Sequence, residues 1–203
     1  MPIYIVYIGT TYFNERGCAR LYELFVLGEL MTGDKHGYML QDVLKHSIGL
    51  VRKISSGTLY PLLSRLTDSG RIRLFVEEET PGGRTRKIYQ ITEAGRERFR
   101  ELMEQPLEPG AEGETEFVFR FKMVYFQYVA KDVRLACLEQ YLRILETNYG
   151  HVTDFESYLR NRKPEPEMQR VQLLRVFDHR KRLAETDIRW VTEEIERTRT
   201  QER

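Results

Sequence analysis

Two short stretches of the sequence combine basic side chains with hydroxyl groups. They run through residues 52–65 and residues 84–87. Lysine and arginine neutralise phosphates and release their counterions, while hydroxyls hydrogen-bond to phosphate oxygens or to base edges. Both stretches therefore suit contact with double-stranded DNA. The candidate DNA-contacting residues are Tyr38, Arg52, Lys53, Ser55, Ser56, Thr58, Tyr60, Ser64, Arg65, Arg84, Thr85, Arg86 and Lys87.

The first stretch lies on a predicted helix. This helix begins at Ser55 or Ser56, whose hydroxyl can accept a hydrogen bond from a free backbone N–H group. Gly70 ends it, because glycine readily takes the left-handed conformation that follows a last helical turn. Leucines recur at three- and four-residue spacing and give the helix one buried face. They are Leu59, Leu62, Leu63 and Leu66.

The second stretch lies on a predicted β-hairpin. Alternating strands cover residues 71–79 and 84–92, and Pro-Gly-Gly at residues 81–83 joins them. A further helix is predicted over Glu93–Glu104. The order of helix, hairpin and helix predicts a winged helix-turn-helix, a DNA-binding fold. The alternative is a solvated helix face beside a soluble hairpin, but the cations lie on both the helix and the wing of one module.

Two more helices are predicted before this module, over Leu21–Met31 and Tyr38–Ser47. His36 precedes the second of them, where a lone histidine is more often a packing residue than a ligand or base. Within residues 1–17, Ile3, Ile5 and Tyr7 alternate with Tyr4, Val6 and Ile8, which suits a strand without an obvious polar face. They fit an extra strand, a helix extension or an appendage of no importance, and the N-terminal segment keeps an unclear role.

Three groups of residues share the order and spacing of a known family. They are Leu27-Gly28 with His36-Gly37-Tyr38, Gly57-Thr58-Leu59-Tyr60-Pro61, and Tyr89-x-Ile91-Thr92-x-x-Gly95. Over residues 21–103 the chain resembles the PadR family of bacterial transcriptional regulators. The resemblance implies a repressor, which in some members releases DNA when a small aromatic molecule binds. It also implies that His36 and Tyr38 lie near the DNA backbone or against the recognition helix.

Beyond residue 105 the sequence changes character. Residues 106–114 are rich in proline, glycine and acid and predict a linker. Residues 117–129 are dense in aromatic side chains, and long helices are predicted over Lys131–Arg160 and Glu167–Thr198. Apolar residues repeat along both helices at steps of three and four, the spacing of a helix packed against another helix.

A lone pair of such helices buries little surface, so the pattern favours a homodimer over a monomeric hairpin folded on the winged domain. A winged helix-turn-helix also reads a palindrome as a two-fold pair. The candidate dimerisation residues are Leu135, Leu138, Leu142, Leu145, Leu174, Phe177, Ile188, Val191 and Ile195.

The predicted fold is mainly α with a small β-wing. Four segments are expected along the chain: an N-terminal extension (1–17), a winged helix-turn-helix DNA-binding domain (18–105), a linker (106–114) and a helical dimerisation and effector domain (115–203).

A small aromatic effector would need apolar faces together with hydroxyl or indole donors. The candidate effector-binding residues are Phe117, Phe121, Tyr125, Tyr128 and Trp190. For any one of them a place in the core is the more common role, and Trp190 could instead pack against the partner subunit. The cavity expected for the effector lies between the winged domain and the C-terminal helices.

Composition and motifs narrow the class of protein. The chain has 32 basic and 31 acidic residues, so its charge is local rather than global, which suits a specific DNA binder. It has no phosphate-binding glycine loop, nucleophile elbow or metal-ligand spacing, so we expect neither an enzyme nor a cofactor or metal. No apolar run reaches the length of a membrane span and no signal peptide is evident, which predicts a cytoplasmic protein.

Two competing functions stay open. A winged helix can serve as a protein-interaction module without an operator, although such a module has no need of clustered cations. A thiol redox response through Cys18 or Cys137 would require a depressed thiol pKa.

Overall fold

The structure is a computed structural model that describes residues 15–47, 56–79, 85–108, 114–163 and 166–200. The chain divides into two compact units, Met1–Gln105 and Pro106–Arg203, and each is described by itself. The mainly helical fold with a small antiparallel wing confirms the predicted fold class.

The described residues of the first unit form four helices and three strands. In chain order they are α1 (Glu15–Met31), β1 (Lys35–His36), α2 (Gly37–Ser47), α3 (Ser56–Asp68), β2 (Ile72–Glu79), β3 (Thr85–Ile91) and α4 (Glu93–Glu104).

The predicted helices and strands are present, but helix α1 begins at Glu15 rather than Leu21. Glu15, Arg16, Ala19 and Arg20 favour a helix, although this segment has no apolar period that would have predicted one. Part of the predicted N-terminal extension is therefore helical, and the rest of it lies outside the described residues.

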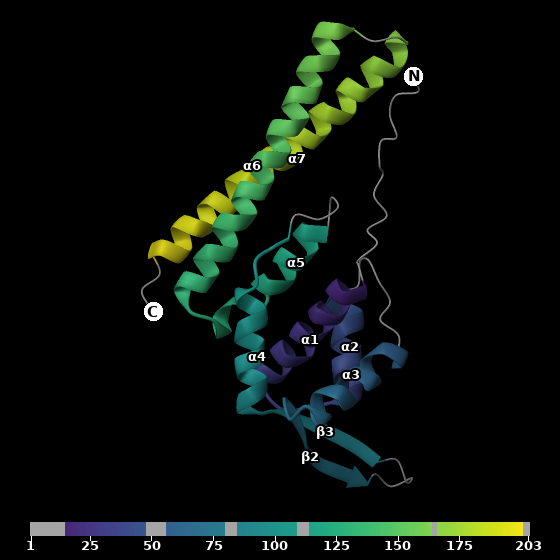
Figure 1. Cartoon of the computed structure of the whole chain (residues 1–203), viewed down its shortest axis with the longest axis vertical. Coiled ribbons are helices and arrows are strands. Elements are labelled where there is room, and N and C mark those ends of the chain that lie inside the picture. Colours follow the sequence, from purple (N-terminus) through teal and green to yellow (C-terminus); the bar gives the residue numbers. More distant parts are fainter. Residues whose placement is uncertain (1–14, 48–55, 80–84, 109–113, 164–165, 201–203) are drawn as a thin grey trace. The chain divides into compact units, whose positions relative to one another are not determined.

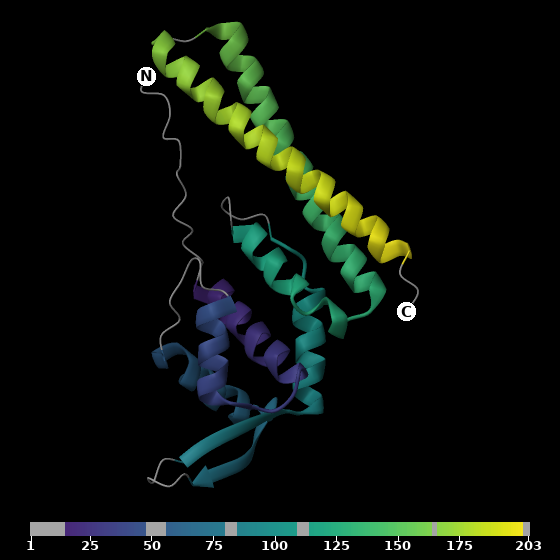
Figure 2. The same cartoon turned by 180° about the vertical axis from the view of Figure 1, so that it is seen from behind.

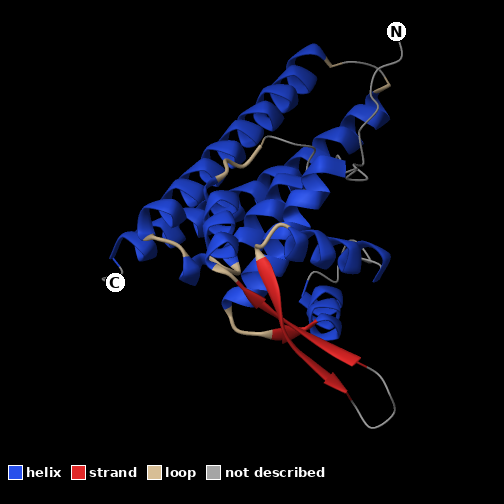
Figure 3. Cartoon of the chain, turned by 60° about the horizontal axis from the view of Figure 1, so that its bottom comes forward, coloured by secondary structure: helices blue, strands red, loops and turns tan. Residues whose placement is uncertain are grey.

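The three strands form one antiparallel sheet in the order β1-β3-β2. Strand β1 was not predicted, because two residues carry no periodicity. It pairs Lys35 with Tyr89 on β3. Strands β2 and β3 form the wing, with an irregularity in register between Leu74 and Val76 (Figure 3). The predicted turn at residues 81–83 lies outside the described residues.

The base of the wing is tied to α4 by one threonine. Gly70 ends α3 with φ of 68°, the left-handed conformation predicted for it. Thr92 is the N-cap of α4: its Oγ1 accepts a hydrogen bond from the Gly95 N–H at 3.1 Å. The same hydroxyl lies 2.7 Å from the Gly70 carbonyl oxygen and 2.9 Å from that of Arg71. The Thr92 side chain therefore connects the end of α3, the start of β2 and the start of α4.

The nearly buried carboxylate of Glu23 connects α1 with the start of β2 and with α4. Glu23 on α1 accepts a hydrogen bond from Arg71 Nη1 at 2.7 Å and from Arg98 Nε at 3.1 Å. Its second oxygen accepts from Arg98 Nη2 at 3.2 Å. Arg71 leads into β2 and Arg98 belongs to α4, so the carboxylate links three segments that are far apart in the sequence.

The second unit consists of α5 (Glu114–Met123), a short 3-10 helix (Phe126–Tyr128), α6 (Lys131–Arg162) and α7 (Glu167–Thr200). Helices α6 and α7 run side by side as a long antiparallel pair (Figures 1 and 2). Lys163 ends α6 in the left-handed conformation, with φ of 47°. A hydrophobic core in this unit brings together buried residues of α5, α6 and α7 and the segment before α5. They are Leu107, Phe119, Cys137, Leu138, Tyr141, Val191 and Ile195.

Part of the predicted linker belongs to this core. Leu107 is only 1% exposed, and its backbone exchanges two hydrogen bonds with the side-chain amide of Gln140 on α6. The proline, glycine and acidic residues near Leu107 predicted a linker, so the role of this one apolar residue in the core was not predicted. Among the described residues, no helix is both long enough and apolar enough to cross a membrane.

Candidate nucleic-acid interface

Helix α3 has two distinct faces. Leu59, Leu62, Leu63 and Leu66 are between 0 and 4% exposed and form the inner face predicted from their spacing. The opposite side presents exposed polar and aromatic side chains to solvent. They are Thr58, Tyr60, Ser64 and Arg65. The buried face fixes how the helix is rotated, and this rotation leaves the candidate DNA-contacting residues accessible.

The start of α2 packs tightly against α3. A Cβ built on Gly37 would lie 3.3 Å from Tyr60 Cε1 and 3.4 Å from Tyr89 Cε2, so only glycine leaves ordinary spacing here. Next to it, the rings of His36 and Tyr38 stack with centroids 5.2 Å apart. Tyr38 and Tyr60 are 50% and 45% exposed. Gly37 thus allows the start of α2, with Tyr38, to lie close to Tyr60 on α3. Both tyrosines are exposed candidates for DNA contact.

The wing carries the second set of candidates. Lys87 is exposed on β3, and the strand register places it opposite Glu77 on β2. Ser56, Thr85 and Arg86 lie at element ends where only the backbone is described. Arg52, Lys53, Ser55 and Arg84 fall outside the described residues.

The arginines at positions 65, 71 and 73 have different roles, some structural and some at the surface. Arg71 is held by Glu23, so it serves the fold rather than offering a free charge. Arg73 donates a hydrogen bond from Nε to Gln90 Oε1 at 2.7 Å, across the base of the wing. Arg65 is exposed and forms no ion pair with any residue that the structure describes. Counting cations along the sequence could not separate these roles, because Glu23 lies 48 residues before Arg71.

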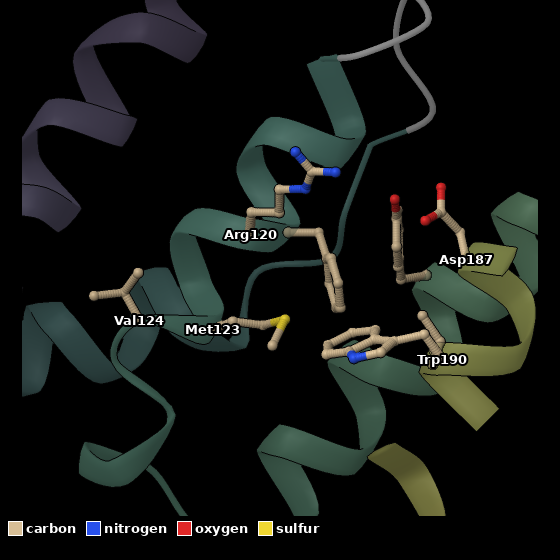
Figure 4. A pocket seen from close by; sticks show the side chains of 8 residues that line it. Arg120, Met123, Val124, Asp187 and Trp190 are labelled. Atoms are coloured by element: carbon tan, nitrogen blue, oxygen red, sulfur yellow. The ribbon is translucent and has the colours of Figure 1, made fainter. Parts of the chain in front are cut away.

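The candidate effector residues do not share one cavity. Phe121 and Tyr125 are buried and pack edge to face with centroids 5.8 Å apart, and Phe117 lies 6.2 Å from Phe121. These three therefore form an aromatic cluster in the second unit. Trp190 lines a pocket of about 480 Å³ between α5, α6 and α7, and the other four candidates are not among the residues that line it (Figure 4).

The other residues of that pocket were missed by the sequence analysis. Phe119, Tyr141 and Asp187 line it together with Trp190. They come from three separate helices, and no short motif connects them. Their one sequence signal is indirect: Tyr141, Asp187 and Trp190 fall beside the apolar repeat of two helices predicted to pack together.

The candidate dimerisation residues mostly hold α6 and α7 of one chain together. Leu138, Phe177, Val191 and Ile195 are buried within the chain. Leu135, Leu142 and Leu145 are partly buried and pack against the same core. Leu174 and Ile188 are also partly buried. The repeat at steps of three and four thus contributes to the helix pair inside one chain, and contact with a second chain stays a prediction for its partly exposed members.

The described thiol does not have the properties of a redox sensor. Cys137 is buried, and this burial raises its pKa to about 11, against the small lowering effect of the Lys122 charge. A thiol with a raised pKa is a poor nucleophile at physiological pH. The side chain of Cys18 is outside the described set. Among the described residues no cluster of His, Cys, Asp and Glu could hold a metal ion.

Comparisons with known proteins agree with this arrangement. The model of the "Transcriptional regulator PadR-like family" matches residues 26–101. Transcriptional regulator Rv3488 of Mycobacterium tuberculosis is 34% identical over 83 residues, which cover 40% of this chain and 69% of that protein.

The chain also matches solved structures at lower identity. Bacillus subtilis PadR in complex with operator DNA is 16% identical, with a TM-score of 0.41, and the match covers 87% of this chain and 98% of that one. The PadR-like regulator BC1756 from Bacillus cereus is 20% identical, with a TM-score of 0.38, over 89% of this chain and 99% of that one.

Proposed function

The chain belongs to the PadR-like family of transcriptional regulators, and on that premise we propose that it represses transcription by binding a palindromic operator as a dimer. The observation that carries this proposal is the two-faced helix α3, whose leucines are buried while Thr58, Tyr60, Ser64 and Arg65 face solvent. A helix fixed in this way by its own core can enter a major groove without rearranging.

In this proposal the two candidate regions divide the work. The exposed side of α3 contacts base edges and sets discrimination between sequences. The wing rests Lys87, with its neighbours Arg84 and Arg86, on the adjacent backbone or minor groove. Two-fold symmetry would place the half-sites about one helical turn, ~34 Å, apart.

A second copy would cover apolar side chains that one chain leaves exposed. Val176 and Leu183 lie seven residues apart on α7 and are 43 and 55% exposed. Seven-residue spacing keeps them on one side of the helix, the pattern of a helix seam. We therefore propose that this exposed stripe contacts the second copy. Leu138, Val191 and Ile195 are buried within one chain and are not part of the proposed contact. Phe177, buried beside Phe155, likewise stays within one chain.

We also propose that a small molecule controls DNA binding. The protein would act in the cytoplasm. Trp190 lines the pocket between α5, α6 and α7, so it remains in the proposed effector site. Phe121 and Tyr125 are buried in the second unit, whereas Phe117 and Tyr128 are partly exposed.

A mobility shift assay of the purified protein tests the proposal. The DNA is the region upstream of its own gene together with a library of genomic fragments, at two salt concentrations. We expect a discrete complex that survives excess unrelated DNA and weakens as salt rises. A folded dimer that retains no fragment would contradict the proposal and favour a protein-interaction module.

A further inference from the structure

The N-terminal half of α3 carries no charged or amide side chain. From Ser56 to Leu63 its sequence is SGTLYPLL, and Arg65, in the last turn, is the first charged residue of the helix. The recognition helix of a helix-turn-helix reads base edges with its N-terminal residues. Arginine or lysine recognises guanine there, and asparagine or glutamine recognises adenine. This half of α3 therefore offers neither of the usual bidentate contacts.

The side chains that this half of α3 exposes are rich in carbon. Thr58 and Pro61 are both exposed, and their three-residue spacing places them on one side of the helix. Tyr60, between them in the sequence, is 45% exposed. Pro61 has no N–H to donate within the helix, and it is exposed rather than packed in the core. Packing within the unit therefore does not account for this apolar surface.

The start of α2 presents a surface of the same kind. Tyr38 is 50% exposed and Met39 is 40% exposed. The residue before them, Gly37, approaches the Tyr60 ring so closely that a Cβ added to it would lie 3.3 Å from Tyr60 Cε1. The two side chains at the start of α2 therefore add to the apolar surface of α3.

Thymine is the DNA base that fits such a surface. It alone among the four bases presents a methyl group in the major groove, and apolar atoms such as the methyl of threonine contact this group. We propose that the N-terminal half of α3 recognises thymine through its C5-methyl group, with the Thr58 methyl as the main contact and the Tyr60 ring beside it. This inference rests on the proposed function, because it names the base that the exposed side of α3 reads.

The test begins with sites that the full-length protein selects from a random duplex library. Fluorescence anisotropy then compares the selected duplex with one that has deoxyuridine in place of each thymine of the half-sites. Deoxyuridine keeps the hydrogen-bonding groups of thymine and lacks only the methyl. Loss of one buried methyl should weaken binding about fourfold, so one contact in each of two half-sites should give about fifteenfold. Deoxyuridine outside the half-sites is the control and should leave the affinity unchanged.

A conservative variant tests the contact itself. Thr58→Ser removes the side-chain methyl and keeps the hydroxyl. In this variant deoxyuridine should weaken binding by no more than about fourfold in total, because the thymine methyl has lost its partner. Thr147→Ser is the matched control, since Thr147 is exposed on α6 in the second unit. It should keep the full difference between thymine and deoxyuridine. Circular dichroism confirms that each variant is folded.

Three results would overturn this inference and leave the proposed function intact. The selected half-sites could lack thymine, the deoxyuridine duplex could bind as tightly as the thymine duplex, or Thr58→Ser could keep the full difference between them. A folded dimer that enriches no sequence from the library would instead contradict the proposed function, and this inference with it. The two failures are therefore distinguishable.

Discussion

Gly37 lies so close to Tyr60 that a Cβ added to the glycine would be 3.3 Å from the Tyr60 ring. Tyr60 is nearly half exposed on α3, while Gly37 begins α2. The glycine thus controls where an exposed aromatic of the proposed recognition helix sits. A residue with no side chain is therefore predicted to affect DNA binding.

Substitution Gly37→Ala should weaken operator binding by about tenfold while leaving the fold intact, because the Tyr60 ring must move by a few tenths of an ångström. Fluorescence anisotropy with labelled operator DNA measures the affinity. Gly150→Ala is the control, since a Cβ at Gly150 on α6 meets nothing within 4 Å. Unchanged affinity of the Gly37 variant would show that the position of Tyr60 does not matter.

A second glycine is required by sterics alone. A Cβ on Gly95 would overlap the Arg71 carbonyl oxygen and lie 2.8 Å from Ile91 Cγ1. Gly95→Ala should therefore destabilise the chain by roughly 2–3 kcal/mol, as overpacking of a rigid site does. Urea unfolding followed by circular dichroism measures this. Gly150→Ala is the control, because it adds a Cβ in open space inside α6 and should not destabilise the chain. A Gly95 variant as stable as the wild type would contradict the steric account.

The Glu23 network should behave as a structural unit. Glu23→Gln leaves Arg71 and Arg98 without their shared carboxylate and should cost about 2 kcal/mol, less than a fully buried pair because both arginines are partly exposed. Glu101→Gln breaks the exposed pair of the same Arg98 and should cost under about 0.5 kcal/mol. Equal losses in urea unfolding would show that burial of Glu23 adds nothing.

The helix pair of the second unit contains a pH-dependent contact. Glu156 on α6 binds Lys181 on α7 and also Arg160 Nη2 at 2.6 Å. Hydrogen bonds from Lys181 and then Arg160 lower the pKa of Glu156 below its ordinary value. A carboxylate with a lowered folded pKa stabilises the fold above its ordinary pKa, and this contribution disappears as the pH falls through the folded value.

Glu156→Gln should therefore unfold at a lower temperature than the wild type at neutral pH. The difference should shrink as the pH falls below the ordinary glutamate pKa and through the lower folded value, where the wild-type carboxyl becomes protonated. Thermal unfolding of both full-length chains across this range gives the comparison. A difference that does not change with pH would exclude the ion pairs as its cause.

The buried thiol should be unreactive in the folded protein. With a pKa of about 11, Cys137 is almost entirely protonated at physiological pH. Iodoacetamide should modify it only after denaturation, as peptide mass spectrometry would detect separately from Cys18. Rapid alkylation of Cys137 in the native state would return a thiol-based response to consideration.

Much of the winged unit could be predicted from the sequence, because its determinants are local. The leucine spacing of α3, the left-handed Gly70 and the cap at Thr92 each act within a few residues. The pairing of Arg71 with Glu23 could not be predicted, since it depends on how distant segments meet.

The second unit shows the same limit more clearly. Periodicity correctly indicated two long helices, yet it could not say whether their apolar faces meet within one chain or between two. Leu138 and Val191 are buried inside the chain, whereas Val176 and Leu183 remain exposed. The pocket lined by Asp187 and Trp190 arises only where three helices come together.

The central claim is that α3 distinguishes sequences while the wing only binds the backbone. Anisotropy titrations of the wild type, Thr58→Ala and Lys87→Ala against operator and unrelated DNA at several salt concentrations test it most directly. We predict that Thr58→Ala lowers the ratio of the two affinities, whereas Lys87→Ala weakens both equally and reduces the salt slope by about one. Equal losses on both DNAs for both variants would contradict this account.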